Sequence, residues 1–300
     1  MTFSLAHFSD PHLGPLPKGA VLQDFAFKKI IGAASWHMNR KKHHLPQIAD
    51  ALRADILAAN PDHVAFTGDL VNISAEVEFD QGLKWLDGFG SSDFVSFTPG
   101  NHDAYVKLPL AKGLGKFSNY MTNEIAKDES LPFIRLRRNV ALIGIHAACP
   151  QLLLGAGGTI GAAQLQKLDM NLQSLRERGF YRLVMIHHPP APGMTSPIRS
   201  LSDASALESV LKKQGAELVI HGHNHERNFT EIVSDTTRIP VLGVPSASMA
   251  AGSAHPPAAW NRYDIERYKG IWKTRVQIRN WNAEASSFSD GDSFILEGAS

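Results

Sequence analysis

The sequence predicts an α/β protein whose single domain, residues 1–280, contains two β-sheets. In the first hundred residues, apolar runs typical of buried strands alternate with segments of helical periodicity. This order is typical of a mostly parallel sheet that is flanked by helices. A second series of strands and helices follows, and then runs that predict antiparallel strands. The expected strands cover residues 3–9, 63–67, 94–97, 133–136, 139–146, 181–186, 216–220, 229–233, 239–244, 263–268 and 271–278.

Helices are expected where apolar residues recur at helical spacing between these strands. The clearest covers residues 45–60, with Pro46 in its first turn and Pro61 as its stop signal. Its inward face is predicted to carry Ile48, Leu52, Ile56 and Leu57. The other helices are expected at residues 76–90, 117–126, 164–178 and 203–213. The polar tail, residues 281–300, is expected to fray.

Residues 14–44 form a long connection between the first strand and the first helix. We call this segment the insertion. Asp24 is its only acidic residue, and it also carries aromatic side chains such as Phe27 and Trp36. One interpretation is a solvated loop with one helical turn. The other is a flap near the functional site that touches a substrate phosphate or a lipid surface. The basic residues of the insertion are Lys18, Lys28, Lys29, Arg40, Lys41 and Lys42.

Composition and charge narrow the class of protein. The 300 residues are 43% hydrophobic and 20% charged, which is ordinary for a globular protein. A net charge of +1 gives no broad positive surface, so nucleic acid is not favoured as a partner. No apolar stretch approaches the roughly 20 residues of a membrane span, and no signal peptide is expected. The single cysteine, Cys149, excludes an intrachain disulfide, which fits the reducing cytoplasm.

Five clusters of possible metal ligands follow strand-like runs. Asp10 and His12 are two residues apart, so an extended backbone puts both side chains on one side. At residues 99–103 a sharp Pro-Gly turn is followed by Asn, His and Asp. Carboxylates neutralise the charge of a divalent ion, imidazoles suit transition metals, and asparagine offers a neutral oxygen. Together the clusters predict a two-metal centre. The candidate residues are Asp10, His12, Asp69, Asn101, His102, His187, His223 and His225.

The ordered blocks resemble those of the calcineurin-like metallophosphoesterase superfamily over residues 3–250. Their wording ("SDPHLG", "TGDLVN", "PGNHD", "HHPP" and "HGHNH") is most similar to the bacterial class III cyclic-nucleotide phosphodiesterases. The resemblance implies a four-layer αββα sandwich with two mixed β-sheets, the metallophosphoesterase fold. It also implies two divalent or trivalent metal ions as cofactors, which would be iron, manganese or zinc.

The same resemblance implies a role for each candidate residue. The first metal would be bound by Asp10, His12 and His225, the second by Asn101, His187 and His223, and both by Asp69. His102 would stay off the metals, near the oxygen of the leaving group. The implied reaction is hydrolysis of a small phosphodiester, such as a cyclic nucleotide, by in-line attack of a hydroxide that bridges the metals.

Two other functions remain open at this point. The first is hydrolysis of a lipid-linked or sugar-nucleotide pyrophosphate, which peripheral lipid contact through the insertion would favour. The second is a non-catalytic scaffold of the same fold, which is disfavoured because none of the implied ligands is missing. The insertion is longer than expected between these blocks, and it can reshape the substrate pocket. The sequence makes no prediction of oligomeric state.

Overall fold

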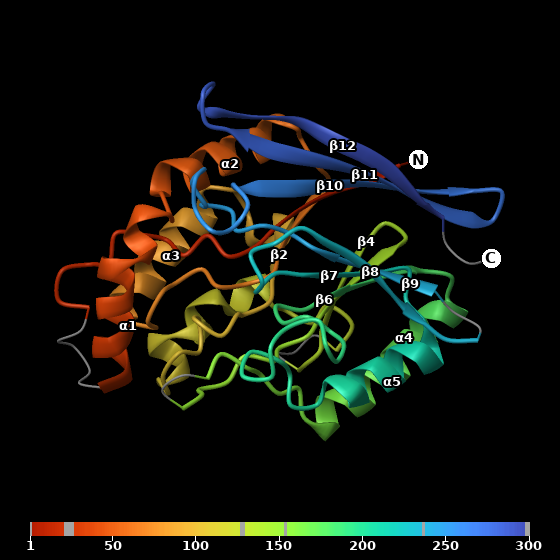
Figure 1. Ribbon diagram of the computed structural model, residues 1–300. Coiled ribbons are helices and arrows are strands. Elements are labelled where there is room, and N and C mark those ends of the chain that lie inside the picture. The colour runs from red at the N-terminus through yellow and green to blue at the C-terminus, as the bar shows by residue number, and fades with distance from the viewer. Residues whose placement is uncertain (1, 21–26, 127–129, 153–154, 236–237, 298–300) are drawn as a thin grey trace.

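A computed structural model describes residues 2–20, 27–126, 130–152, 155–235 and 238–297. It contains two mixed sheets that face each other (Figure 1). In the first sheet the strands lie in the order β12 (Ser287–Glu297), β11 (Ile271–Asn282), β10 (Ala259–Tyr268), β1 (Phe3–Phe8), β2 (His63–Phe66) and β3 (Val95–Phe97). In the second the order is β4 (Phe133–Arg137), β5 (Val140–Gly144), β6 (Tyr181–Met185), β7 (Leu218–His221), β9 (Arg238–Gly243) and β8 (Asn228–Val233).

Helices cover the outer face of each sheet, except for the first helix of the chain, which lies apart from the strands (Figure 1). The helices are α1 (Phe27–Met38), α2 (Pro46–Ala58), α3 (Glu76–Asp87), α4 (Ala162–Glu177) and α5 (Ala204–Gln214). Apolar side chains of α2 and α3 share one buried cluster with the first sheet, and those of α4 and α5 share another with the second sheet. A third cluster fills the space between the sheets. The predicted four-layer αββα sandwich is therefore confirmed.

The strands alternate between these layers because successive side chains point to opposite faces of a sheet. In β1, Leu5 packs between the two sheets, whereas Phe8 packs in the cluster that contains the apolar face of α2. On α2, Ile48 and Ile56 are buried as predicted, but Leu57 is 39% exposed. A neighbouring residue is rotated by about 100° around a helix, so Leu57 points away from the core that Ile56 enters.

Parallel pairing brings the predicted clusters to one edge of the sandwich. Strands β1, β2 and β3 are parallel neighbours, and so are β5, β6 and β7. Each cluster follows the carboxyl end of one of these strands, which is where α/β sheets usually bind their ligands. The antiparallel pair predicted at 133–146 is also confirmed, as β4 and β5.

The predictions for residues 117–126 and for the polar tail are wrong. Where a helix was expected over residues 117–126, the structure has a 3₁₀-helix at Leu114–Tyr120. The polar tail does not fray at residues 287–297, because β12 pairs with β11 along an antiparallel ladder. Its buried Phe288 and Leu296 are spaced among serines and aspartates, which is the pattern of a half-buried strand and not of a disordered tail.

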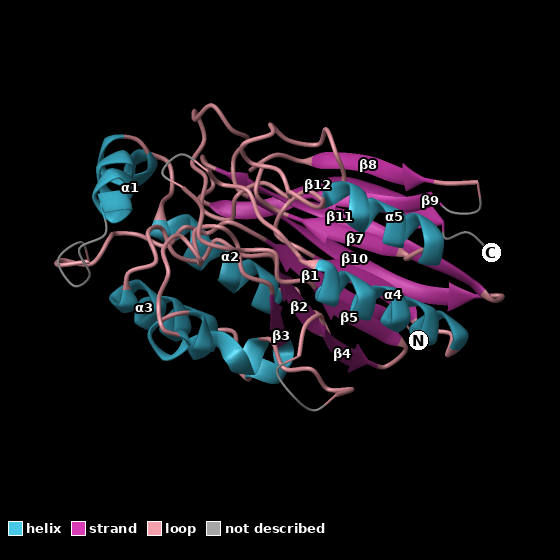
Figure 2. Ribbon diagram, turned by 90° about the horizontal axis from the view of Figure 1, so that it is seen from below, coloured by secondary structure: helices cyan, strands magenta, loops and turns pink. Residues whose placement is uncertain are grey.

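The insertion is not a loop with one helical turn, because α1 is a helix of 12 residues. Lys29, Ala33 and Trp36 form its buried face, at the spacing of a helix. A 3₁₀ turn at Arg40–Lys42 follows. Figures 1 and 2 show α1 at one end of the molecule, away from the strands. Among the described residues, no helix is both long and apolar enough to cross a membrane.

Candidate metal centre

The structure brings all the predicted site residues together at the carboxyl ends of the parallel strands. In the first group, His225 Nε2 lies 3.1 Å from Asp10 Oδ1 and 3.2 Å from His12 Nε2. His12 Nε2 is also 3.7 Å from Asp69 Oδ2. These four side chains are those that the family resemblance assigns to the first metal ion.

The second group surrounds His187. Its Nε2 lies 3.4 Å from Asp69 Oδ2, 3.3 Å from Asn101 Oδ1 and 3.2 Å from His223 Nδ1. The opposite ring nitrogen, Nδ1, donates a hydrogen bond to the carbonyl oxygen of Thr67 at 2.6 Å. That bond fixes the orientation of the imidazole and aims Nε2 at the group. Oδ2 of Asp69 therefore contacts both groups.

Several of these residues are held in a strained backbone conformation. Positive φ angles are uncommon for residues other than glycine, and strain of this kind gathers at functional sites. Five of the predicted site residues have positive φ: Asp10 (54°), His12 (40°), Asp69 (58°), His223 (70°) and His225 (56°). Glycines allow the close approach of the turns, because a Cβ at Gly100 would collide with Asp69 and one at Gly222 would collide with Ser9 and Asp10.

Asp103, the last residue of the Pro-Gly-Asn-His-Asp turn, ties two of these loops together. Its carboxylate accepts hydrogen bonds from the backbone N–H groups of Asp69 and Gly100 at 2.8 Å, and from those of Leu70 and Val71. Burial and the nearby Asp69 carboxylate raise the pKa of Asp103 to about 7. The sequence placed Asp103 in the motif, but its structural role as a backbone anchor was not predicted.

The donor set fits a pair of transition-metal ions. Seven oxygen and nitrogen atoms from carboxylates, imidazoles and an amide converge, and several lie 3.1–3.4 Å apart. Burial lowers the pKa of His12 and His223 well below the usual value, so both imidazoles are neutral, as metal ligands must be. Burial also favours neutral His187, but the carboxylates of Asp69 and Asp10 outweigh it and raise its pKa to about 9. A cation between these groups would compete with that proton.

His102 lies beside the two groups. Its backbone N–H donates to Asp69 Oδ1 at 2.7 Å, and its Nδ1–H donates to the carbonyl oxygen of Asn72 at 2.5 Å. Nε2 is therefore the nitrogen left for a ligand. Burial and the guanidinium of Arg40, whose Nη1 is 3.1 Å from Nδ1, lower the pKa of His102 to about 3. The imidazole is thus neutral in this structure.

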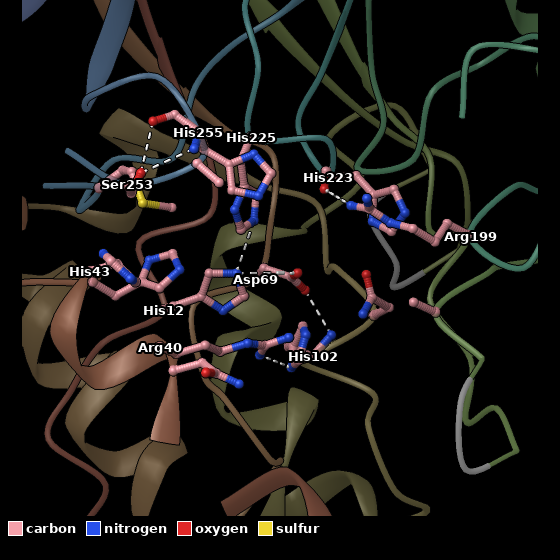
Figure 3. A pocket seen from close by; sticks show the side chains of 16 residues that line it. His12, Arg40, His43, Asp69, His102, Arg199, His223, His225, Ser253 and His255 are labelled. Atoms are coloured by element: carbon pink, nitrogen blue, oxygen red, sulfur yellow. Dashed lines mark hydrogen bonds and ion pairs between the residues drawn. The ribbon is translucent and has the colours of Figure 1, made fainter. Parts of the chain in front are cut away.

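A cavity of about 350 Å³ opens onto these residues. Two arginines line it that were not predicted as site residues (Figure 3). Arg40 comes from the insertion and reaches toward His102, whereas Arg199 lies beside His223 and donates to its carbonyl oxygen at 2.5 Å. The excess of basic residues in the insertion was the only signal for Arg40, and no pattern in the sequence indicated Arg199. Histidines 43, 44 and 255 also line the cavity.

Comparisons with known proteins identify the family and the fold. A model of the calcineurin-like phosphoesterase family matches residues 3–227. A probable cyclic nucleotide phosphodiesterase of Synechococcus sp. (strain WH7803) is 31% identical over 173 residues, which cover 54% of this chain and 55% of that protein. The match thus spans about half the length of this curated relative.

Two solved structures show the same fold. A dimetal phosphatase from Danio rerio aligns over 99% of both chains, with a TM-score of 0.64 and 14% sequence identity. Purple acid phosphatase PPD1 from yellow lupin (Lupinus luteus) seeds aligns over 99% of this chain and 54% of its own, with a TM-score of 0.59 and 11% identity.

Proposed function

The chain belongs to the calcineurin-like phosphoesterase family, as its sequence blocks predicted, and on this premise we propose that it hydrolyses a small phosphodiester with two ions of iron, manganese or zinc. The observation that carries the proposal is the position of Asp69, whose Oδ2 lies within 3.7 Å of an imidazole in each group. The similarity to a probable cyclic nucleotide phosphodiesterase supports a cyclic nucleotide as one such substrate.

The two groups of side chains would hold one ion each. Asp10, His12 and His225 would bind the first ion, Asn101, His187 and His223 the second, and Asp69 both. When bound, such a pair of ions lowers the pKa of a water molecule and neutralises charge on the phosphate oxygens. Asp10 also accepts a hydrogen bond from the backbone N–H of His223 at 3.0 Å, which links the loops that carry the two groups.

The remaining polar residues of the cavity would orient the substrate. Arg40 is mostly buried and, among the described residues, forms no ion pair with a carboxylate, so its guanidinium is available for phosphate oxygens. Arg199 would approach the same anion from the His223 side. His102 would contact the leaving-group oxygen through Nε2. An anionic phosphate next to His102 would raise the pKa of its imidazole. The imidazole could then take up a proton and pass it to the leaving-group oxygen.

One feature of α1 favours the second candidate, a lipid-linked pyrophosphate. Its outer face is apolar, with Phe27 66% and Met38 64% exposed, and Ile30 and Ile31 lie between them. Exposed apolar faces of amphipathic helices are typical of lipid contact. The exposed Lys41 and Lys42 lie in the 3₁₀ turn after α1, and they would suit an anionic headgroup. Two arginines in the cavity would also suit a substrate with two phosphate groups.

Initial rates of the metal-reconstituted protein test both candidates. We expect it to hydrolyse bis-p-nitrophenyl phosphate and a 3′,5′-cyclic nucleotide. Failure on every phosphoester with both metals bound would overturn the proposal. For the second candidate, the double variant Phe27→Ser, Met38→Ser should raise KM for a UDP-sugar lipid in vesicles and leave bis-p-nitrophenyl phosphate unaffected. Met170→Ser is the matched control. Met170 is 55% exposed, and it lies on α4, which packs against the second sheet.

A further inference from the structure

The end of the insertion is fixed beside the metal centre. The backbone N–H of Leu45 donates to the carbonyl oxygen of Ser248 at 2.9 Å, and that of Ala250 donates to the carbonyl oxygen of His43 at 2.7 Å. These two bonds lie on either side of His44. They hold it in a short antiparallel pairing with the loop that follows β9, so the backbone fixes the position of His44.

The ring of His44 lies against two of the proposed ligands of the first ion. His44 is 4% exposed, and its ring centroid is 4.7 Å from that of His12 and 5.5 Å from that of His225. One ring nitrogen from each of the three residues lies within 4.8 Å of the other two. Two nitrogen ligands of a tetrahedral zinc ion are about 3.4 Å apart, since each lies about 2.0–2.1 Å from the metal. The three nitrogens would therefore have to approach one another by at most about 1.4 Å to bind one ion, which side-chain rotation can supply.

Hydrogen bonds to two serines bear on which nitrogen of His44 is free to bind an ion. Nδ1 of His44 lies 2.8 Å from Ser248 Oγ and 3.3 Å from Ser246 Oγ. Ser246 Oγ donates its own hydrogen to the carbonyl oxygen of Asp10 at 2.6 Å, so toward His44 it can only accept. The tautomer that satisfies both serines carries its hydrogen on Nδ1, and in that tautomer the lone pair of Nε2 is left for a ligand. His187 is held in the same way, with Nδ1–H bound to Thr67.

We infer that His44 is an additional ligand of the first metal ion, which it would bind through Nε2 together with His12 and His225. The inference rests on the proposed function, since it extends the same two-metal centre. His44 lies in the insertion, between the sequence blocks on which the family resemblance depends. Because imidazoles suit zinc and iron better than manganese, a third imidazole would make the first position selective for zinc or iron.

Metal titration tests this inference without a measurement of activity. The full-length protein is stripped of metal with a chelator and titrated with Zn²⁺ by calorimetry, and Co²⁺ is added in parallel to record its visible absorption spectrum. We expect His44→Ala to weaken binding at one of the two positions by at least about 10-fold and to change the Co²⁺ spectrum, because the coordination number falls. Ser248→Ala should weaken metal binding less than His44→Ala does, since it removes only a hydrogen bond that orients the His44 ring.

His43→Ala is the matched control, because His43 is the adjacent histidine and lines the same cavity. Its zinc affinity and Co²⁺ spectrum should equal those of the wild type. Unchanged zinc affinity and spectrum in His44→Ala, or equal changes in His43→Ala, would overturn the inference and leave the proposed function intact. If His44→Ala does not fold, His44→Gln gives the same test. A wild-type protein that binds no metal would instead refute the proposed function itself.

Discussion

The two halves of the metal centre come from two similar chain segments with different chemistry. The first, from β1 to β3, and the second, from β5 to β7, each consist of three parallel strands joined by helices. The first supplies every carboxylate and the only amide of the predicted ligand set, in Asp10, Asp69 and Asn101. The second supplies only imidazoles, from His187, His223 and His225. Charge neutralisation of the ions would thus depend on the first segment.

The second segment is also oriented by the first. Thr67, at the end of β2, accepts a hydrogen bond from His187, and Asp10 accepts one from the backbone of His223. The positions of these two residues therefore depend on contacts with the first segment. Removal of a residue from the first segment should have the larger effect, because it removes charge and also a partner that positions the second segment.

The strongest test of this difference is Asp69→Ala. Since Asp69 contacts both groups, we expect the variant to retain neither metal and to lose activity on bis-p-nitrophenyl phosphate. Elemental analysis after gel filtration measures the metal content. Glu208→Ala on α5, outside the centre, serves as the acidic control and should retain two metals. Two metals retained in Asp69→Ala would show that the carboxylate is not shared.

The matching change in the second segment is His187→Ala. Its imidazole lies near Asn101 and His223 but belongs to one group only. We expect this variant to lose the second ion and to keep the first, with one metal per chain by elemental analysis. Loss of both ions would mean that the two positions fill cooperatively, and the contrast between the segments would then fail.

A smaller effect is expected for His102→Ala, since His102 would contact substrate and not metal. Both metals should remain, while kcat should fall by about 10²–10⁴-fold, the usual contribution of a general acid or base. The loss should shrink for substrates with good leaving groups such as p-nitrophenol, because they need less protonation. A constant loss over a series of leaving groups would argue for a purely structural role.

The sequence predicted the first and second segments well because both obey local rules. Ligand types follow apolar runs, and parallel pairing then brings the ends of the strands together. The insertion was harder to predict. Lys28 and Lys29 interrupt the apolar pattern of α1, although Lys29 is buried in the structure. The proximity of Arg40 and His44 to the centre depends on how residues 43–45 pair with the loop after β9, and no local pattern shows such a tertiary contact.

The smallest predicted effect concerns a buried histidine of the first segment that lies away from the ligands. His63, in β2, contacts Ser96 Oγ through Nε2 at 2.8 Å. Burial lowers its pKa well below 6.5, and the positive charges of Arg137 and Arg135 on β4 lower it further. Below pH 6.5 the unfolded chain therefore binds a proton at this position that the folded protein does not bind. Stability must fall as the pH falls, by about 2 kcal/mol between pH 7 and pH 5 for one such group.

His63→Gln should remove this contribution while it keeps a polar group near Ser96. Urea unfolding at pH 7 and pH 5 measures the difference, and each variant is compared with the wild type at the same pH because metal binding also depends on pH. We expect His63→Gln to lose about 2 kcal/mol less than the wild type over this interval. His37→Gln, at an exposed position on α1, should follow the wild type. Equal pH dependence in His63→Gln and the wild type would show that His63 does not contribute to the acid sensitivity of the first segment.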